Sequence, residues 1–368
     1  MGVHSGPPSD SGAPRGLVVL GYPYLPSVTT GRGIDRYLAY LVGGLRARGV
    51  PFREVENGRF RSHLRQLALG EPDIVRRVGR VRGGIWHAAS PVGGRVAGIL
   101  GREPLVTTVH DVVPFRLLHL HPARYRFLRF CIRMSCAKSV RIISPFEFTR
   151  RYLVEHVGVP AGKTRIVPLG VDPTSLAAAA TSEPLFAGDP TRRVLFLGSW
   201  NPIERGGDIA VRAWAEVVRA RPDAELLVSG TGPGIDRLRA LAGSLGIAER
   251  VKFVGFVPEG RLGDAFRSVA VFLYPSRIGF SLSVMQAMHA GVPVVVASSL
   301  DMGEFVADFG AVCPEENPAE VAAALVHLLS DPGARRDLAA RGQERIRQFP
   351  LDAMVDGTLE VYREIGLA

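Results

Sequence analysis

The sequence contains few cysteines, few lysines and no long apolar segment. Its three cysteines, Cys131, Cys136 and Cys313, do not have the spacing of a metal or disulfide framework, which suits a reducing cytoplasm. No apolar run reaches the ~18 residues that a membrane-spanning helix needs. These absences argue against a secreted disulfide scaffold and an integral membrane protein, and we expect no metal ion and no bound cofactor.

The chain is basic, and its cations are nearly all arginine. Lysine and arginine total 45 against 35 acidic residues, for a formal net charge of +10, and only Lys138, Lys163 and Lys252 are lysines. This balance favours anionic partners such as phosphates or acidic membrane surfaces, although a solvated arginine surface also accounts for it. Nucleic acid is not expected, because no binding module or pattern of stacking aromatics accompanies the charge.

Short apolar runs alternate with amphipathic stretches along most of the chain. Strands are predicted at 16–21, 85–89, 105–109, 140–143, 164–168, 194–197, 225–229, 251–254, 271–274 and 294–297. Helices are predicted at 34–48, 92–100, 123–136, 146–156, 208–219, 235–245, 260–267, 282–290 and 319–329, with a helical closing stretch at 335–365. This alternation is typical of α/β proteins with parallel sheets, whose ligands bind beyond the carboxyl ends of the strands.

The pattern restarts once, which predicts two Rossmann-like, doubly wound domains facing a central cleft. We expect a disordered leader at 1–14, an N-terminal domain at 15–172, a linker at 173–193, a C-terminal domain at 194–345 and a final helix at 346–368 that could cross back to the first domain. Loops at 57–84 and 113–122 are expected to select the acceptor.

Four glycine-containing loops follow strands of the second half, at 198–207, 230–234, 255–258 and 275–282. A glycine turn before a helix can direct backbone N–H groups and the helix dipole toward an anion. Arg205 adds a cation whose fork fits phosphate oxygens, and Ser281 is a plausible N-cap. Each loop alone is explained equally well as turn chemistry, but four in this order favour a phosphate-binding site.

The last of these loops carries a recognisable block, YPSRIGFSLSVMQAMHAGVPVV at 274–295. With FLG at 196–198, PDAELLVSGTGP at 222–233 and RVKFVG at 250–255, it resembles the donor domain of retaining glycosyltransferase family four, also called glycosyl transferases group 1, which has the GT-B fold. The first half resembles the acceptor domain of that family more loosely, through TGRGIDRY at 30–37, TVHD at 108–111 and VPLGVD at 167–172.

The resemblance implies an enzyme that moves a sugar from a nucleotide-diphosphate donor to an acceptor with retention of configuration. It implies catalytic roles for His110, facing the donor sugar or its departing phosphate, and for Arg205, in place of the family's phosphate-binding lysine. The residues that it implies for the donor are Gly31, Gly33, Gly198, Trp200, Gly206, Gly232, Gly255, Phe256, Val257, Ile278, Gly279, Phe280, Ser281, Leu282 and Gln286.

The chain departs from the family at two carboxylates. The family's pair of glutamates, eight residues apart, is replaced by Ile278 and Gln286, and its usual arginine after the first glycine is absent. Arg277 could compensate, or could be a solvated surface residue. One hypothesis is a transferase whose donor sugar is deoxy or otherwise modified, with Trp200 and Ile278 forming an apolar face. The alternative is a chain that keeps the fold but has lost sugar transfer, and serves as a binding partner or couples other groups.

The acceptor is open between a small molecule, a glycan and a lipid, in specialised-metabolite (antibiotic or natural-product) or cell-envelope biosynthesis. The stretch 123–133 mixes arginines with aromatics, as helices bound to membrane surfaces do. An ordinary helix with one buried face has the same composition. We therefore expect a cytoplasmic protein, with weak peripheral contact at the inner face of the membrane as an open alternative.

Overall fold

A computed structural model describes residues 16–21, 33–56, 63–172, 185–198, 202–232, 234–279, 281–299 and 301–367, with the backbone alone over 63–71. The predicted leader, most of the predicted linker, and the predicted site residues Gly31, Trp200 and Phe280 lie outside these residues.

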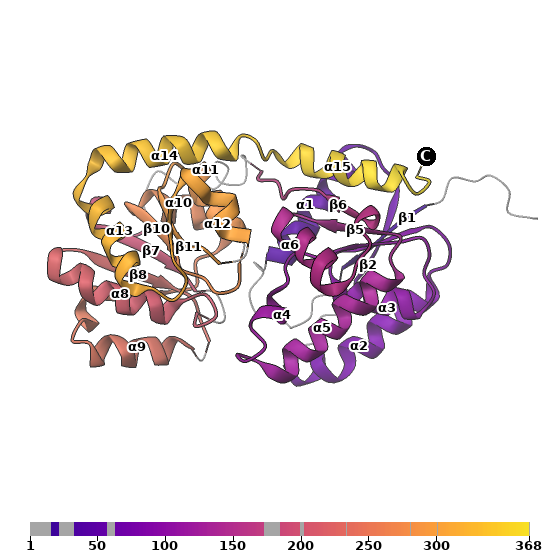
Figure 1. Ribbon diagram of the computed structural model, residues 1–368, viewed down its shortest axis with the longest axis horizontal. Helices are drawn as coiled ribbons and strands as arrows, with labels where there is room; N and C mark the ends of the chain where they lie inside the picture. Colours follow the sequence, from indigo (N-terminus) through magenta and orange to yellow (C-terminus); the bar gives the residue numbers. More distant parts are fainter. Residues whose placement is uncertain are drawn as a thin grey trace, which may run out of the picture.

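Two six-stranded parallel sheets form the framework, one in each half of the chain (Figure 1). The first has the order β2-β1-β3-β4-β5-β6, with β1 Leu17–Gly21, β2 Phe52–Glu56, β3 Ile85–Ala88, β4 Leu105–Thr108, β5 Arg141–Ser144 and β6 Thr164–Ile166. The second has the order β12-β11-β10-β7-β8-β9, with β7 Arg193–Leu197, β8 Glu225–Ser229, β9 Val251–Gly255, β10 Val271–Tyr274, β11 Val294–Ala297 and β12 Ala311–Cys313. The predicted pair of Rossmann-like domains is confirmed.

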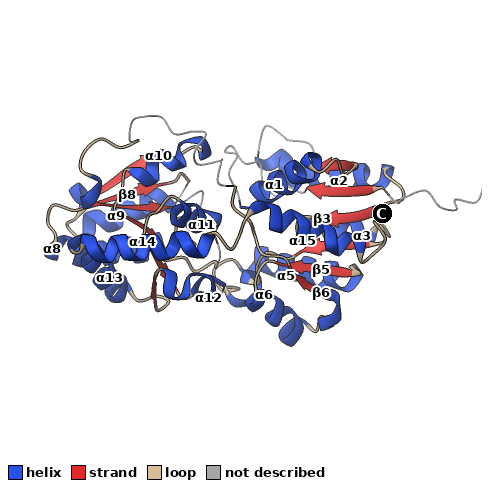
Figure 2. Cartoon of the chain, turned by 90° about the horizontal axis from the view of Figure 1, so that it is seen from above, coloured by secondary structure: helices blue, strands red, loops and turns tan. Residues whose placement is uncertain are grey.

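Helices surround both sheets (Figure 2). In the first domain they are α1 Gly33–Ala47, α2 His63–Arg80, α3 Pro91–Ile99, α4 Val113–Arg116, α5 Pro122–Lys138 and α6 Glu147–Tyr152, which continues into a π-helical turn at Leu153–Val157. In the second they are α8 Gly207–Ala220, α9 Gly234–Ser244, α10 Leu262–Arg267, α11 Leu282–His289, α12 Asp301–Val306, α13 Pro318–Ser330 and α14 Pro332–Ile346, before the final helix α15 Leu351–Arg363.

The predicted loop at 57–84 is wrong, since most of it is helix α2. Strand β2 before it was also missed, because its sequence FREVE has no apolar run and only Val55 is buried. The predicted loop at 113–122 likewise contains the short helix α4. The closing stretch at 335–365 is two helices, α14 and α15, and Pro350 precedes the second because proline cannot continue a helix interior.

Helix α15 lies on the first domain although the chain reaches it from the second (Figure 1). Its Val355 is fully buried and belongs to the same apolar cluster as Leu41 of α1. Arg48 pairs with Asp352 at 2.9 Å and with Asp356 at 2.7 Å on the rim of this contact. The chain therefore crosses between the domains twice, which ties their relative placement to the packing of α15.

Candidate active site

The carboxyl ends of the two sheets face each other. Thr149, on the helix after β5, donates to Asp301, which begins the helix after β11, through its N–H and its hydroxyl at 3.0–3.1 Å. Tyr125, after β4, lies 3.3 Å from Glu204, after β7. Because these residues belong to different domains and all follow strands, the two sheet edges lie close together, as the predicted interdomain site requires.

His110 follows β4 and is held by two contacts. Its Nε2 lies 2.9 Å from the carbonyl oxygen of Ala89, and because a carbonyl can only accept, Nε2 carries the proton. The ring of Tyr37 meets it edge-on with 4.7 Å between ring centroids. Burial lowers the pKa of His110 to about 4, so the imidazole is neutral at pH 7 and its Nδ1 is an acceptor.

A buried hydrogen-bond network lies behind His110. His87 Nε2 is 2.8 Å from the hydroxyl of Thr108, and His87 Nδ1 is 2.5 Å from the hydroxyl of Tyr362 on α15. The hydroxyl of Tyr37 is 3.0 Å from the same Thr108 oxygen. Burial lowers the pKa of His87 to about 3, with the neighbouring His110 as a smaller cause. The final helix thus connects with the residues that orient His110.

Arg205 lies between β7 and α8 and reaches the end of β10. It donates to the hydroxyl of Tyr274, and its guanidinium carbon is 5.6 Å from the centre of that ring. Arg205 also interacts electrostatically with Asp111. Burial raises the pKa of Asp111 above its usual value, while the hydrogen bond from the N–H of Val113 and the charges of Arg124 and Arg205 oppose this rise. Sequence reasoning missed Tyr274 and Asp111 as neighbours of Arg205.

The glycine turn at 198–207 does not present the free N–H groups that we expected. The N–H of Gly198 donates to Ser229 at 2.7 Å, and those of Gly206 and Gly207 donate to carbonyls within the turn at 2.9 and 2.7 Å. Gly206 has a left-handed φ of 77° and faces the carbonyl of Pro275 with no room for a Cβ. These glycines therefore permit close packing of the loop that carries Arg205, and the prediction of anion-binding N–H groups is wrong at these three positions.

The loops after β8 and β9 are joined to each other by hydrogen bonds. Gly232 and Gly255 have φ of 97° and 73°, and the Gly255 carbonyl accepts from Gly230 N–H and the Ser229 hydroxyl, both at 2.9 Å. Phe256 is 37% exposed whereas Val257 is buried. Of these two side chains, both implied for the donor by the family resemblance, Phe256 is exposed and Val257 belongs to the core.

The N-terminus of α11 is capped on one side and open on the other. Ser281 accepts from the N–H of Ser283 at 3.2 Å, which confirms it as the N-cap. Among the described residues, the N–H groups of Gly279, with φ of 68°, and of Leu282 have no acceptor, while the Leu282 side chain is buried. Gly33, the first residue of α1, is exposed. Two free backbone donors thus lie at the positive end of a helix dipole.

Gln286 and Ile278, the two departures from the family motif, both contact the first domain. Gln286 is 1% exposed, and its Oε1 accepts from Arg36 Nη1 at 2.9 Å. Arg36 Nε lies 2.5 Å from Oε1 of Glu259. Ile278 packs against a small apolar cluster that contains Val113 and Tyr125. Nothing in the sequence pattern singled out Arg36 or Glu259, which come together only through the fold.

Arg277 and Glu204 brace the loops around the site. Arg277 donates to both carboxylate oxygens of Asp208 at 2.7 and 3.0 Å, to Glu316 and to the carbonyl of Ile203 at 2.8 Å, so it is neither solvated nor free to bind a phosphate. Glu204 accepts hydrogen bonds from Arg124 and Tyr125 of α5, both at 3.3 Å, and His121 Nε2, just before that helix, lies 2.7 Å from the same carboxylate oxygen.

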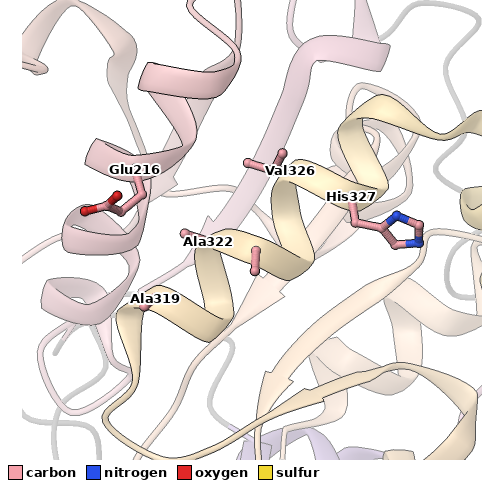
Figure 3. A pocket seen from close by; sticks show the side chains of 6 residues that line it. Glu216, Ala319, Ala322, Val326 and His327 are labelled. Atoms are coloured by element: carbon pink, nitrogen blue, oxygen red, sulfur yellow. The ribbon is translucent and has the colours of Figure 1, made fainter.

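A hollow of about 480 Å³ lies elsewhere, between α8 and α13, and is lined by Glu216, Ala319, Ala322, Ala323, Val326 and His327 (Figure 3). It contains none of the predicted site residues. In the described part of the chain no cluster of three His, Cys, Asp or Glu side chains could hold a metal ion. None of the described helices combines the length and apolarity needed to cross a bilayer.

Comparisons with known proteins identify the family of the chain. The family model "Glycosyl transferases group 1" matches residues 191–331, and "Glycosyltransferase Family 4" matches residues 51–175. The phosphatidyl-myo-inositol mannosyltransferase of Mycolicibacterium smegmatis is 33% identical over 340 residues, covering 89% of this chain and 82% of that protein. The D-inositol 3-phosphate glycosyltransferase of Acidothermus cellulolyticus is 31% identical over 298 residues, covering 74% of this chain and 64% of that protein, so the chain spans less than two thirds of this second relative.

Solved structures support the fold. Sucrose-phosphate synthase from Thermosynechococcus elongatus superposes with a TM-score of 0.79 at 20% identity, over 95% of this chain and 99% of the other. Anabaena HepE, solved with UDP and glucose, superposes with a TM-score of 0.71 at 17% identity, over 95% of this chain and 100% of the other. The chain therefore belongs to family 4 of the glycosyltransferases, and it is a glycosyltransferase with the GT-B fold.

Proposed function

We propose that this glycosyltransferase takes its sugar from a nucleotide-diphosphate donor bound at the N-terminus of α11. The observation that carries the proposal is the pair of N–H groups of Gly279 and Leu282, which have no acceptor among the described residues, at the N-terminus of that helix. Backbone donors at a helix N-terminus suit a phosphate. The exposed ring of Phe256 offers a face for the base. Binding of UDP by the neighbour HepE, and of UDP-glucose in another structure of it, supports the same donor class.

Transfer proceeds with retention of the anomeric configuration, with no protein base. The leaving diphosphate accepts the proton of the attacking hydroxyl, while the N–H groups of α11 and the charge of Arg205 stabilise it. His110 is neutral and presents Nδ1 as an acceptor. An acceptor nitrogen suits a sugar hydroxyl and not a phosphate oxygen, so we assign His110 to the donor sugar.

The transferred sugar presents an apolar edge to Ile278. This side chain packs beside Val113 and Tyr125, where the family motif has a carboxylate. A sugar hydroxyl pointing at Ile278 would lose its partner, at a cost of about 1–3 kcal/mol. We therefore propose that the preferred donor carries a deoxy or otherwise modified sugar.

The acceptor proposed here is a polyol hydroxyl of a cell-envelope precursor. This class is supported by two relatives, which are named as a phosphatidyl-myo-inositol mannosyltransferase and a D-inositol 3-phosphate glycosyltransferase. Peripheral membrane contact through α5 has less support, because Arg124 binds Glu204 and Arg129 and Arg133 lie over the ring of Phe115.

The direct test is turnover of a panel of UDP-, GDP- and dTDP-linked sugars, including deoxy sugars, with inositol and inositol phosphate as acceptors. Release of nucleoside diphosphate only when donor and acceptor are both present supports transfer. Nucleotide binding without turnover of any pair would favour the alternative of a chain that has lost sugar transfer. No binding of any nucleotide would contradict the proposed donor.

The variant Ile278→Glu tests the sugar specificity. We expect its kcat/KM to fall at least tenfold with a deoxy-sugar donor and to rise with the parent hexose donor, because the carboxylate would pair with hydroxyls. Ile99→Glu is the matched control, since Ile99 is 55% exposed at the end of α3. Unchanged kcat/KM of Ile278→Glu with both donors would refute the apolar-edge assignment.

A further inference from the structure

Arg36 reaches across the domain boundary from the first turn of α1. It is 8% exposed, and both of its described partners belong to the second domain. Its Nη1 donates to Gln286 Oε1 at 2.9 Å, and its Nε lies 2.5 Å from Glu259 Oε1. Because one guanidinium touches both side chains, Glu259 and Gln286 lie at the same place although they come from different loops.

That place lies between the two ends of the proposed nucleotide. Glu259 begins the turn directly after the loop that exposes Phe256. Gln286 is one turn into α11, whose N-terminus carries the free N–H groups. A nucleotide with its base on Phe256 and its diphosphate at α11 has its ribose between these sites, where Glu259 and Gln286 converge.

The unused polar atoms at this place match a pair of hydroxyls. Gln286 Nε2 is buried and has no hydrogen-bond partner among the described residues, a costly state for an amide donor unless a ligand supplies an acceptor. Glu259 uses Oε1 toward Arg36, while its side chain is 39% exposed and its other oxygen can accept. Vicinal ribose hydroxyls can satisfy both, one donating to Glu259 and the other accepting from Gln286.

We propose that Glu259 is the carboxylate that recognises the ribose of the donor in this chain, and that Arg36 positions Glu259 and Gln286 from the opposite domain. The inference rests on the proposed nucleotide donor. It makes Glu259 a specificity residue for ribonucleotides, and it couples recognition of the ribose to closure of the two domains.

The test is calorimetric binding of UDP, GDP and ADP to the full chain, followed by the 2′-deoxy and 3′-deoxy forms of the tightest binder. We expect wild type to bind a deoxy form at least tenfold more weakly, the effect of one charge-assisted hydrogen bond. In Glu259→Ala this discrimination should fall to about twofold or less, and Glu259→Gln, which keeps one acceptor, should be intermediate. Glu249→Ala, an exposed glutamate at the other end of β9, should keep the wild-type ratio.

The ratio separates recognition from a structural role of Glu259. If Glu259 only holds Arg36, then Glu259→Ala and Arg36→Met weaken ribo- and deoxynucleotides equally and the ratio stays at its wild-type value, which overturns the inference. Equal binding of both forms by wild type also overturns it and does so without any variant, while the proposed function stands. If UDP, GDP and ADP all fail to bind, the proposed function fails together with the inference.

Discussion

Asp301 is a fully buried carboxylate at the domain boundary, and its ionisation should make stability depend on pH. Burial raises its pKa from 3.8 to about 7; the bonds from Thr149 lower it, and the nearby charge of Asp111 raises it. The folded chain therefore holds a proton that the unfolded chain releases near pH 4. Between these two pKa values the folded state binds more protons than the unfolded state, so stability falls as the pH rises.

The size of this effect follows from the shift. A rise of about three units, at ~1.36 kcal/mol each, amounts to about 4 kcal/mol lost between about pH 4 and pH 7. Asp301→Asn keeps an oxygen that can accept from Thr149 but cannot ionise. We expect the variant to be as stable as wild type near pH 4 and more stable by up to about 4 kcal/mol at pH 8.

Scanning calorimetry of wild type and Asp301→Asn at pH 4.5, 5.5, 6.5, 7.5 and 8 measures this difference as a gap in Tm. We expect the Tm of Asp301→Asn to exceed that of wild type by a margin that grows with pH to several degrees. About 1 kcal/mol moves Tm by roughly 2–4 °C in a domain of 150–250 residues. Asp337→Asn is the control, because Asp337 is 70% exposed and pairs with Arg341 on the surface. A gap that stays constant with pH, or a variant less stable than wild type at pH 8, would refute the reasoning.

Three further predictions concern the packing of buried and interdomain residues. Tyr362→Phe removes a hydroxyl bonded to buried His87, and we expect a loss of about 1–3 kcal/mol in thermal unfolding; an unchanged Tm would contradict this. Glu204→Ala removes a carboxylate that three residues of the other domain contact, so the radius of gyration from X-ray scattering should increase, and an identical value would argue against a closing role. Gly206→Ala and Gly246→Ala both place alanine at a positive φ, which costs about 1–2 kcal/mol of stability. Only at Gly206 does the new Cβ also collide with backbone, so we expect a larger loss of stability there. Equal losses in the two variants would disprove the steric argument.

The interior of each sheet could be predicted because burial on both faces leaves uninterrupted apolar runs. Strand β10, VFLY, and strand β11, VVVA, are buried at every residue and were predicted with the observed bounds. The edge strand β2, FREVE, buries one residue in five and has charges at three positions, so a search for uninterrupted apolar runs does not detect it. The missed strand β12, AVC, is also an edge strand and is only three residues long.

Features of the site that depend on neighbours in sequence could be predicted, whereas contacts between residues far apart in sequence could not. The N-cap Ser281 could be predicted because cap chemistry depends on neighbours in sequence. The contact of Arg36 with Gln286 spans 250 residues, and that of Tyr125 with Glu204 spans 79, so only the docking of the domains creates them. Arg277 was ambiguous for the same reason, because its partner Glu316 lies 39 residues away.

The two missing glutamates look like losses in sequence, but in the structure both positions are interdomain contacts. A carboxylate at position 278 would lie beside the apolar cluster of Val113 and Tyr125, and it would need the hydroxyls of a bound sugar to replace the water that it loses there. A carboxylate at position 286 would bind Arg36 as an ion pair and compete with Glu259 for the same guanidinium. With Ile278 and Gln286 the first domain can close against apolar surface and a neutral amide, and Arg36 keeps its charge for Glu259. The departures from the family motif are therefore consistent with one another, and with the proposal that Glu259 is the carboxylate that recognises the donor.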